Sequence, residues 1–349
     1  MAPTIPELTW QSLTATVNEI KSPNQFLRRL LFGQTVNLET ETIEVGILTG
    51  DREMAPFVKK NGQAIMVEGL GEKFHAIEAP NIRIKRPFTP SSAFFTRRPG
   101  TSVFPTGQEQ SSAIQQHIAR DMARMSDLAT NAEEWLVAQA ITGTVSYEVD
   151  EEEAYTITFP KPSGNTVILT KFWDQSAPEI EQDFMTAKKI ISEEVGLSPT
   201  DCVMSETAAT EFLQASEVRS LLDNRNVAAG AISFNEQFRD DGAIFLGFFG
   251  GLRCWMYPRT VTMSDGSTAK MIRDKYVEFL TASPAADNVI YYGAIPDWEA
   301  FESGLLATSR FAKSWVEKDP SVRVALLHTR PLPVPRRPGS MVSMKVISG

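Results

Sequence analysis

The side chains that most often bind metal ions or act as nucleophiles are scarce in this sequence. It contains two cysteines, Cys202 and Cys254, and three histidines, His75, His117 and His328. No two of these five residues have the spacing of a metal-binding motif. We therefore expect no metal site. We also expect both cysteines to be reduced residues of the core, with a disulfide between them as the alternative.

Pairs of carboxylates are a second kind of candidate catalytic site, because one acidic side chain can act as general acid and the other as general base. Asp297 with Glu299 and Glu193 with Glu194 are such pairs, but a chain with 43 acidic residues contains many of them. The sequence has neither a Gly-rich phosphate loop nor a nucleophile elbow. We expect no catalytic residue and no cofactor, and we keep a hydrolase with a carboxylate pair as a less favoured alternative.

Two clusters of charge are better candidates for a functional role. The basic cluster consists of Arg83, Lys85, Arg86, Arg97 and Arg98. The acidic cluster consists of Glu148, Asp150, Glu151, Glu152 and Glu153. Charges of this kind orient a contact between proteins more than they strengthen it. The two clusters are therefore candidates for contacts between neighbouring molecules, and a solvated start of a hairpin is the simpler interpretation of the acidic one.

The clearest element lies between these two clusters. Apolar residues recur every three or four positions over residues 107–142, which predicts one long helix. At 1.5 Å per residue such a helix is roughly 50 Å long, whereas a compact globule of this chain length has a radius of gyration of about 20 Å. The sequence therefore predicts a flat or elongated molecule.

The segments before the long helix contain little core of their own. Two short helices, the second over residues 25–32, predict a peripheral arm, and a strand is expected over residues 35–45. Residues 46–105 are rich in proline and glycine and have no strong core periodicity. Loops of this length are usually functional or disordered. We expect an extended, two-stranded excursion that needs an outside surface on which to pack.

The segments after the long helix mix short helices and strands in the manner of an α+β protein. A hairpin is expected between residues 155–159 and 167–169, and a second one between residues 311–315 and 322–326. Further expected helices cover 177–195 and 207–214, and further expected strands cover 202–204, 244–249, 252–257, 276–281, 289–294 and 341–347.

The overall composition is that of a globular protein. Of the 349 residues, 42% are hydrophobic and 22% charged, and the formal net charge is −9. A chain this acidic is a poor candidate for a reader of nucleic acid. The longest apolar run covers residues 243–252, about half of what a membrane helix needs, and no signal peptide is visible. We therefore expect a soluble protein that stays in the compartment where it is made.

The order of these elements resembles the Hong Kong 97 phage capsid fold. The residues themselves resemble the major capsid protein of lambda-type tailed phages. The segments that carry this resemblance are Phe26–Phe32, Ala55–Val58, Tyr292–Ile295, Ser309–Trp315, Asp319–Arg323 and Pro331–Leu332. The resemblance covers nearly the whole chain and depends on the order of motifs that are individually weak. The proline-rich residues 331–338 and the acidic residues 148–153 depart from the family pattern.

The resemblance implies an α+β fold with five consecutive parts. These are an N-terminal arm (1–35), an extended loop (36–105), a peripheral domain with the long helix and a hairpin (106–175), an axial domain (176–303) and a return to the peripheral domain (304–349). The basic cluster would then contact acidic residues of an adjacent subunit, with residues 148–153 as the first candidates.

The resemblance also implies a function. Such a protein assembles with itself into hexamers and pentamers that form the icosahedral head shell around phage DNA, without catalysis. Implied partners are scaffold, portal and decoration proteins, with double-stranded DNA enclosed but not bound specifically, and no membrane. The implied location is the virion capsid, after assembly in the host cytoplasm. The alternatives are an encapsulin-like shell that holds a cargo enzyme, a tail or connector protein, and the hydrolase.

Overall fold

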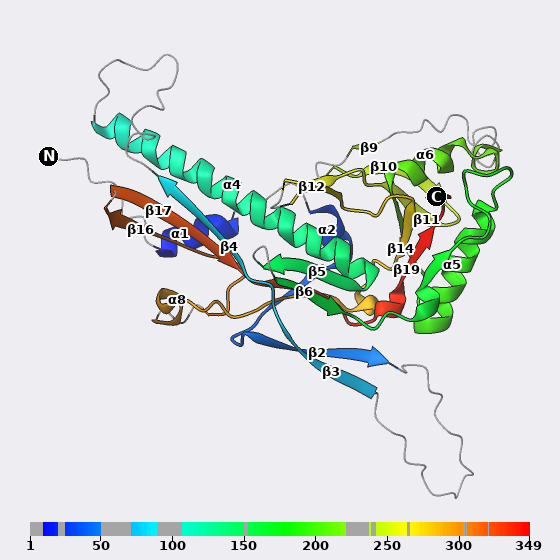
Figure 1. Ribbon diagram of the computed structural model, residues 1–349, viewed down its shortest axis with the longest axis horizontal. Coiled ribbons are helices and arrows are strands. Elements are labelled where there is room, and N and C mark those ends of the chain that lie inside the picture. The colour runs from blue at the N-terminus through cyan, green and yellow to red at the C-terminus, as the bar shows by residue number, and fades with distance from the viewer. Residues whose placement is uncertain are drawn as a thin grey trace, which may run out of the picture.

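The longest element of the molecule is a single helix that joins its two ends. The computed structural model describes residues 10–19, 25–49, 71–88, 107–149, 153–220, 237–238, 242–263, 266–302, 304, 306–319 and 321–349. Helix α4 (Gly107–Thr142) has 36 residues, which confirms the predicted helix. It runs from a small sheet at one end to a larger sheet at the other, and the molecule is elongated along it (Figure 1).

Helix α4 connects two separate hydrophobic cores because different parts of it are buried in each. Met122, Met125 and Ala129 pack into the core at the small sheet. Val137 and Ile141 pack into the core between the helix and the larger sheet. The helix ends at Gly143, whose positive φ of 90° suits a residue without a Cβ atom.

The larger sheet has seven strands in the order β7-β19-β14-β8-β11-β10-β9. Their bounds are β7 (Thr166–Ile168), β19 (Met341–Lys345), β14 (Tyr276–Leu280), β8 (Asp201–Met204), β11 (Leu252–Met256), β10 (Ile244–Phe249) and β9 (Gln237–Phe238). Helices α5 (Ile180–Val195) and α6 (Glu206–Gln214) share a core with one face, to which Cys202 and Met204 belong. Val203 belongs to the opposite face, which packs toward α4 and α2 (Phe26–Leu31). The two faces follow from the alternation of side chains along β8.

The small sheet contains β16 (Phe311–Lys318), β17 (Ser321–Thr329) and β4 (Ile82–Phe88), in that order. The predicted C-terminal hairpin is thus confirmed as β16 and β17. Helix α1 (Trp10–Glu19) lies along β16. The Thr14 hydroxyl donates to the Ala312 carbonyl at 3.1 Å and accepts from the Ala312 amide at 3.0 Å. This contact satisfies backbone groups that an edge strand would otherwise expose.

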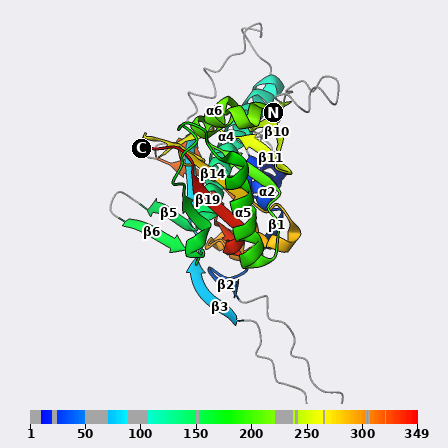
Figure 2. The same ribbon diagram turned by 90° about the vertical axis from the view of Figure 1, so that its right-hand side faces the viewer.

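Two ribbons and two smaller groups of strands complete the fold. Strands β2 (Thr42–Thr49) and β3 (Gly71–Glu78) form a two-stranded ribbon that projects from the body, and Figure 2 shows the same projection from the side. Strands β5 (Thr144–Val149) and β6 (Glu153–Thr158) form a hairpin. The remaining elements are β1 (Gln34–Asn37), β15 (Asn288–Tyr292) and β18 (Pro331–Pro335) in one sheet, the pair β12 (Thr260–Thr262) and β13 (Thr268–Lys270), helix α8 (Trp298–Glu302), and the 3-10 turns Ser163–Asn165, Pro284–Ala286 and Pro338–Ser340.

The strand expected over residues 35–45 is wrong as a single element. Its first half is β1, which pairs in parallel with β15, and its second half belongs to β2, which pairs with β3. The chain turns between them because the two halves have partners in different places. The predicted loop range 36–105 also contains β4, which pairs with β17 in the small sheet.

The hairpin expected between residues 155–159 and 167–169 is also wrong. Strand β6 pairs with β5, and Tyr147 and Tyr155 stack across that pair at 5.8 Å. Strand β7 instead pairs in parallel with the distant β19. Alternation identified β6 and β7 as strands, but it carries no information about which strand is the partner.

The first five residues of the proline-rich segment 331–338, which departs from the family pattern, form β18. All five of its residues are buried, and it lies at the edge of its sheet. Its prolines occupy alternate positions, so that the amides of Leu332 and Val334 lie on the side of the partner β15. An edge strand tolerates prolines in this arrangement because their missing amides point away from the partner.

Candidate assembly surfaces

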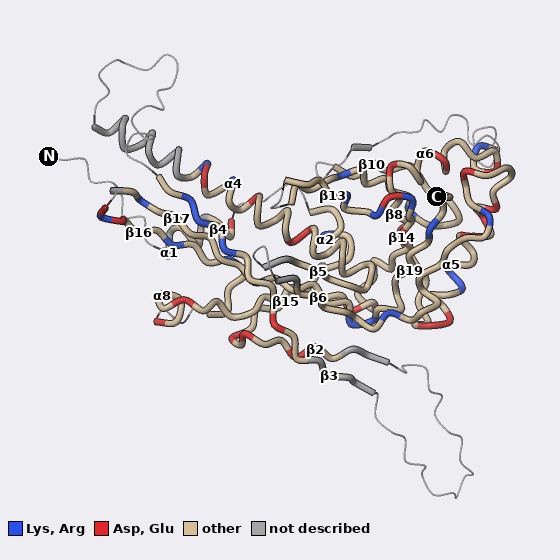
Figure 3. Tube along the Cα trace, in the orientation of Figure 1, with Lys and Arg blue, Asp and Glu red and all other residues tan. Residues whose placement is uncertain are grey.

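The described part of the basic cluster lies on β4 and is divided between the two faces of the small sheet. Arg83 and Lys85 are exposed, whereas Arg86 is half-buried on the face toward α4. Figure 3 shows basic residues along this strand. Successive side chains of a strand point to opposite faces. Residues that are neighbours in the sequence therefore have different surroundings.

The intrachain partners of these residues differ accordingly. Arg86 Nη2 lies 3.1 Å from Asp121 Oδ1 of α4, and the Asp121 side chain is only 10% exposed. Lys85 Nζ lies 3.4 Å from Glu317 Oε1, with both side chains exposed, and 5.5 Å from the centre of the Trp315 ring. Exposed pairs contribute about 0–1 kcal/mol. Lys85 is thus available for another partner at little cost, whereas Arg86 has a buried partner, Asp121, in its own subunit.

The two described members of the acidic cluster, Glu148 and Glu153, lie at one end of the hairpin of β5 and β6. Glu148 and Glu153 are backbone members of this hairpin, in which Val149 is paired with Glu153. Asp150, Glu151 and Glu152 lie outside the described residues. Arg97 and Arg98 of the basic cluster also lie outside them. A contact between the two clusters of neighbouring subunits therefore stays a prediction.

A second exposed surface, which the sequence analysis did not single out, is formed by aromatic residues of α8. Trp298 is 79% exposed and Phe301 60%, and their rings meet edge to face at 6.1 Å. They line a groove of about 410 Å³ that also includes Glu39 and Glu41. Clustered exposed aromatic side chains usually mark an interaction site. We call this surface the aromatic groove.

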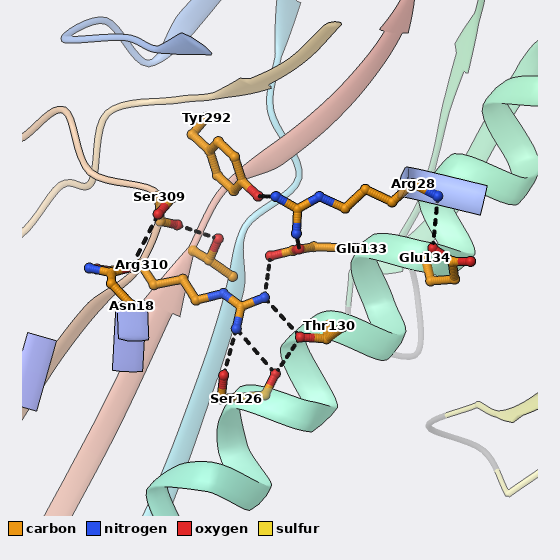
Figure 4. A network of polar contacts seen from close by, with 10 residues as sticks. Asn18, Arg28, Ser126, Thr130, Glu133, Glu134, Tyr292, Ser309 and Arg310 are labelled. Atoms are coloured by element: carbon orange, nitrogen blue, oxygen red, sulfur yellow. Dashed lines mark hydrogen bonds and ion pairs between the residues drawn. The ribbon is translucent and has the colours of Figure 1, made fainter. Parts of the chain in front are cut away.

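Behind these surfaces lies a buried polar junction that connects the N-terminal helices to α4 (Figure 4). Arg310, which precedes β16, donates from Nη1 to the Ser126 hydroxyl at 2.6 Å. Its Nη2 donates to the Thr130 hydroxyl at 2.9 Å and to Glu133 Oε1 at 3.0 Å. The buried guanidinium is thereby compensated by one carboxylate and by two hydroxyls of successive turns of α4.

Glu133 connects a second arginine to the same junction. Its Oε2 lies 2.9 Å from Arg28 Nη1, and Arg28 Nη2 donates to the Tyr292 hydroxyl at 3.0 Å. The Glu133 side chain is 1% exposed. One carboxylate thus holds Arg28 of α2 and Arg310 of the β16 segment against the long helix. Burial also raises the pKa of Tyr292, so that its hydroxyl stays protonated.

The adjacent Glu134 holds the start of α2. It accepts hydrogen bonds from the amides of Leu27 at 2.7 Å and Arg28 at 3.1 Å, and from the Tyr257 hydroxyl at 3.1 Å. These amides belong to the first turn of α2, which has no side-chain cap of its own. A carboxylate of another helix therefore supplies the cap. Burial raises the pKa of Glu134 to about 7, although the hydrogen bonds from Leu27, Arg28 and Tyr257 act against that rise.

The junction could be suspected from the sequence only in part. Glu133 and Glu134 interrupt the apolar pattern of the long helix, and Arg28 and Arg29 interrupt an otherwise apolar helix. Both are signs of buried charge that needs partners. Nothing in the sequence pairs Glu133 with Arg310, which follows 177 residues later.

The residues considered for chemistry form no single cluster among the described side chains, although Cys202 and Cys254 lie opposite each other in paired strands. Cys202 and Cys254 are free and buried in neighbouring strands. His328 is buried beside Asn81, and burial lowers its pKa to about 4. Asp297 pairs with Lys313 at 2.6 Å. The side chains of His75 and His117 lie outside the described ones.

In the described ranges, no three His, Cys, Asp or Glu side chains are grouped so that they could hold a metal ion. No helix in those ranges has both the length and the apolar character of a membrane span.

The comparisons with known proteins agree with each other. The family model described as phage major capsid protein E matches residues 9–346. The major capsid protein of Enterobacteria phage P21 is 23% identical over 344 residues, which are 97% of this chain and 98% of the relative.

The solved structures extend the same likeness to the fold. The crystal structure of a prophage capsid protein from Escherichia coli CFT073 superposes with a TM-score of 0.72 at 18% identity, covering 97% of this chain and 99% of the other. The capsid structure of cyanophage P-SCSP1u gives 0.52 at 7% identity, covering 95% and 91%. The expected α+β capsid fold is therefore confirmed. The chain belongs to the phage major capsid protein E family, and it is a structural protein that forms the head shell of a virion.

Proposed function

We propose that this chain assembles into hexamers and pentamers, and that these close into an icosahedral shell around phage DNA. The observation that carries the proposal is the ribbon of β2 and β3, which projects from the body of the subunit. Ile43 and Val45 anchor its base in the core between α4 and the larger sheet. A two-stranded ribbon without further support is marginally stable in water. A neighbouring subunit can supply the missing surface.

A ribbon that lies on the neighbour's body makes a heterologous contact, in which two different surfaces meet. Contacts of this type close into rings when the rotation between subunits is suitable. The division into an arm (1–35), a loop (36–105), a peripheral domain (106–175), an axial domain (176–303) and a return segment (304–349) belongs to this proposal. Strands β7 and β19 lie outside the axial range but in the larger sheet, so the proposed domains share one sheet.

We place the charged contacts of the shell on the exposed part of β4. Arg83 and Lys85 would face the acidic hairpin tip of an adjacent subunit, at residues 148–153. Arg97 and Arg98 are assigned to the same contact from the sequence. The exposure of Arg83 and Lys85 supports this assignment, whereas the ion pair of Arg86 with the buried Asp121 does not favour it for that residue.

The aromatic groove is proposed as a second contact between copies of this chain. Its apolar floor is flanked by the exposed carboxylates of Glu39 and Glu41. A second copy is the proposed occupant because a head shell is built from many copies of this chain, and a basic side chain of that copy would complement the two carboxylates. Complementary charge at the rim orients such a contact.

The remaining partners follow from the proposed role. A net charge of −9 supports a shell that encloses double-stranded DNA without gripping it, because each phosphate contact would need a basic side chain. Scaffold, portal and decoration proteins are proposed partners, and the host cytoplasm is the proposed place of assembly. We propose no catalytic activity and no membrane contact.

Negative-stain microscopy beside size-exclusion chromatography of the purified protein tests the proposal. Closed shells, or rings of five and six subunits, are the expected result. A monomer that stays compact at every concentration, even with a scaffold protein, would contradict it. Nuclease-protected DNA in particles from infected cells distinguishes a phage head from an encapsulin-like shell that holds cargo enzyme.

A further inference from the structure

The largest fully buried side chain of the described residues is a charged one, Arg330. It lies between β17 and β18 and is only 2% exposed. A buried guanidinium is costly unless its donors are satisfied by carboxylates or carbonyls. The groups that contact the Arg330 guanidinium therefore indicate the structural role of this side chain.

Both carboxylate partners of Arg330 belong to the ribbon of β2 and β3. Nη2 lies 3.2 Å from Glu78 Oε1, and Glu78 is the last residue of β3. Nη1 lies 3.7 Å from Glu41 Oε2, and Glu41 directly precedes β2. One guanidinium thus contacts the two chain segments through which the ribbon leaves and rejoins the body.

The other contacts of Arg330 attach this pair to the body. Nη1 donates to the Ala294 carbonyl at 3.0 Å and Nη2 to the Ala79 carbonyl at 3.4 Å. The Ala294 amide in turn donates to the Thr40 carbonyl at 2.9 Å. The segments before β2, after β3 and after β15 therefore meet around one side chain.

The packing at this point leaves little room for a larger residue. A Cβ atom added to Gly293 would lie 3.2 Å from the Cβ of Ala79 and 3.6 Å from the Glu41 carbonyl. Close approach of the backbone is a common reason for glycine at such a site. The base of the ribbon is thus tightly packed at Gly293, whereas the side chains of Glu41 and Glu78 are 57% and 75% exposed.

Because the side chains of Glu41 and Glu78 are exposed, substituting them can change the direction of the ribbon without unfolding the subunit. A buried polar group that loses its partner usually destabilises a protein. An exposed carboxylate contributes less, because a neutral side chain that replaces it is still hydrated by solvent. In the glutamine variants the side-chain amide oxygens can still accept from Arg330, as the Ala294 and Ala79 carbonyls do, whereas Arg330 Nε has no hydrogen-bond partner among the described residues even in the parent. Removal of the two negative charges should therefore loosen the ribbon against the body and leave the hydrophobic core intact.

We propose that Arg330 is a positioning residue for shell assembly. By holding Glu41 and Glu78 together, it fixes the direction in which the ribbon leaves the body. That direction decides where the ribbon meets the neighbouring subunit. The contact with the neighbouring subunit rests on the proposed function, whereas the fixed direction of the ribbon does not.

The test measures the direction of the ribbon in the unassembled subunit. Spin labels are attached at T49C on the ribbon and S192C on α5, and the distance distribution is measured by double electron–electron resonance. The native Cys202 and Cys254 are buried, so they do not compete for the label. We expect a single narrow distribution in the parent and at least a twofold broader one in the double variant E41Q/E78Q.

The matched control is E44Q, which removes a carboxylate from the same ribbon at an exposed position. We expect E44Q to keep the narrow distribution, and E78Q alone to reproduce most of the broadening because it has the shorter contact. Unchanged width in E41Q/E78Q would overturn the proposal. A double variant that does not fold would also overturn it, since these carboxylates would then maintain the fold.

Assembly is measured separately on the same variants. We expect E41Q/E78Q to yield at least a fivefold smaller fraction of closed regular shells than the parent and E44Q. A broad ribbon with normal shells would overturn the positioning role in assembly. If the parent itself forms no shells under any condition, the proposed function fails, while the distance measurement still decides whether Arg330 fixes the ribbon.

Discussion

Arg310 and Glu133 form an ion pair of 3.0 Å in which the side chains are only 8% and 1% exposed. The pair joins the residue before β16 to the last third of α4, and Glu133 also holds Arg28 of α2. Removal of one partner from a buried pair costs about 3–5 kcal/mol, because the other charge stays buried.

We expect R310M to lower the free energy of unfolding of the unassembled subunit by about 3 kcal/mol, toward the lower end of that range because Arg28 still compensates Glu133. Urea unfolding measures this change. The matched control is K189M, because Lys189 has an exposed pair with Glu193 at 3.8 Å and should change stability by less than about 0.5 kcal/mol. Equal effects of the two substitutions would contradict the role of the junction.

Glu134 should make stability depend on pH in a specific direction. Its pKa in the folded protein is about 7, above its ordinary value of 4.5, so the folded state binds the proton more tightly than the unfolded state. The resulting stabilisation is fully present below about pH 4.5 and is lost as the pH rises through 7.

The measurement compares the urea midpoints of the parent and E134Q between pH 5 and 8.5. Stability of the parent relative to E134Q should fall across this range, because the amide does not titrate. Contributions of other groups, such as His328 with its pKa of about 4, cancel in this difference. Parallel curves for the two proteins would rule out a shifted Glu134.

Charge reversal on β4 should separate assembly from folding. R83E/K85E changes two exposed residues, so we expect a folded subunit with an unchanged thermal midpoint and a several-fold loss of assembled shells. R86E places a carboxylate beside Asp121 and should lower the thermal midpoint by several degrees. R97E/R98E should also impair assembly. Normal shells from R83E/K85E would disprove the contact assigned to this strand.

The aromatic groove provides a further test of assembly. W298A/F301A removes two exposed rings, and we expect the folded subunit to assemble at a several-fold higher threshold concentration, measured by light scattering. I168A serves as control because Ile168 is 63% exposed and does not line the groove. An unchanged threshold in W298A/F301A would leave the groove without a role in assembly.

Hydrophobic periodicity in the sequence predicted whether most segments form helices or strands, because this periodicity arises when one face of a helix or strand is buried. The helix is found with the predicted bounds, and from Met122 onward its apolar periodicity is produced by contacts with two cores. Alternation identified β6 but not its partner β5, because any register that keeps the apolar face buried fits the same residues.

For the charged residues, the sequence alone could not show which of them share a surface or are buried together. Arg83, Lys85 and Arg86 formed one cluster in the sequence, but a strand places Arg86 on the opposite face from the other two. The buried junction was missed since its members come from residues 28, 133, 134 and 310 and meet only in the folded chain. Burial of Arg330 was missed for the same reason.

The last strand of the chain, β19, occupies an internal place in the larger sheet, between β7 and β14. A ribosome must therefore synthesise residue 345 before the sheet can close, because β7 has no other partner among the described strands. Chains that are released early expose an open sheet edge and an unfinished core, and such species are prone to aggregation. A chain that stops before β19 therefore lacks the strand that joins β7 to β14 in the larger sheet.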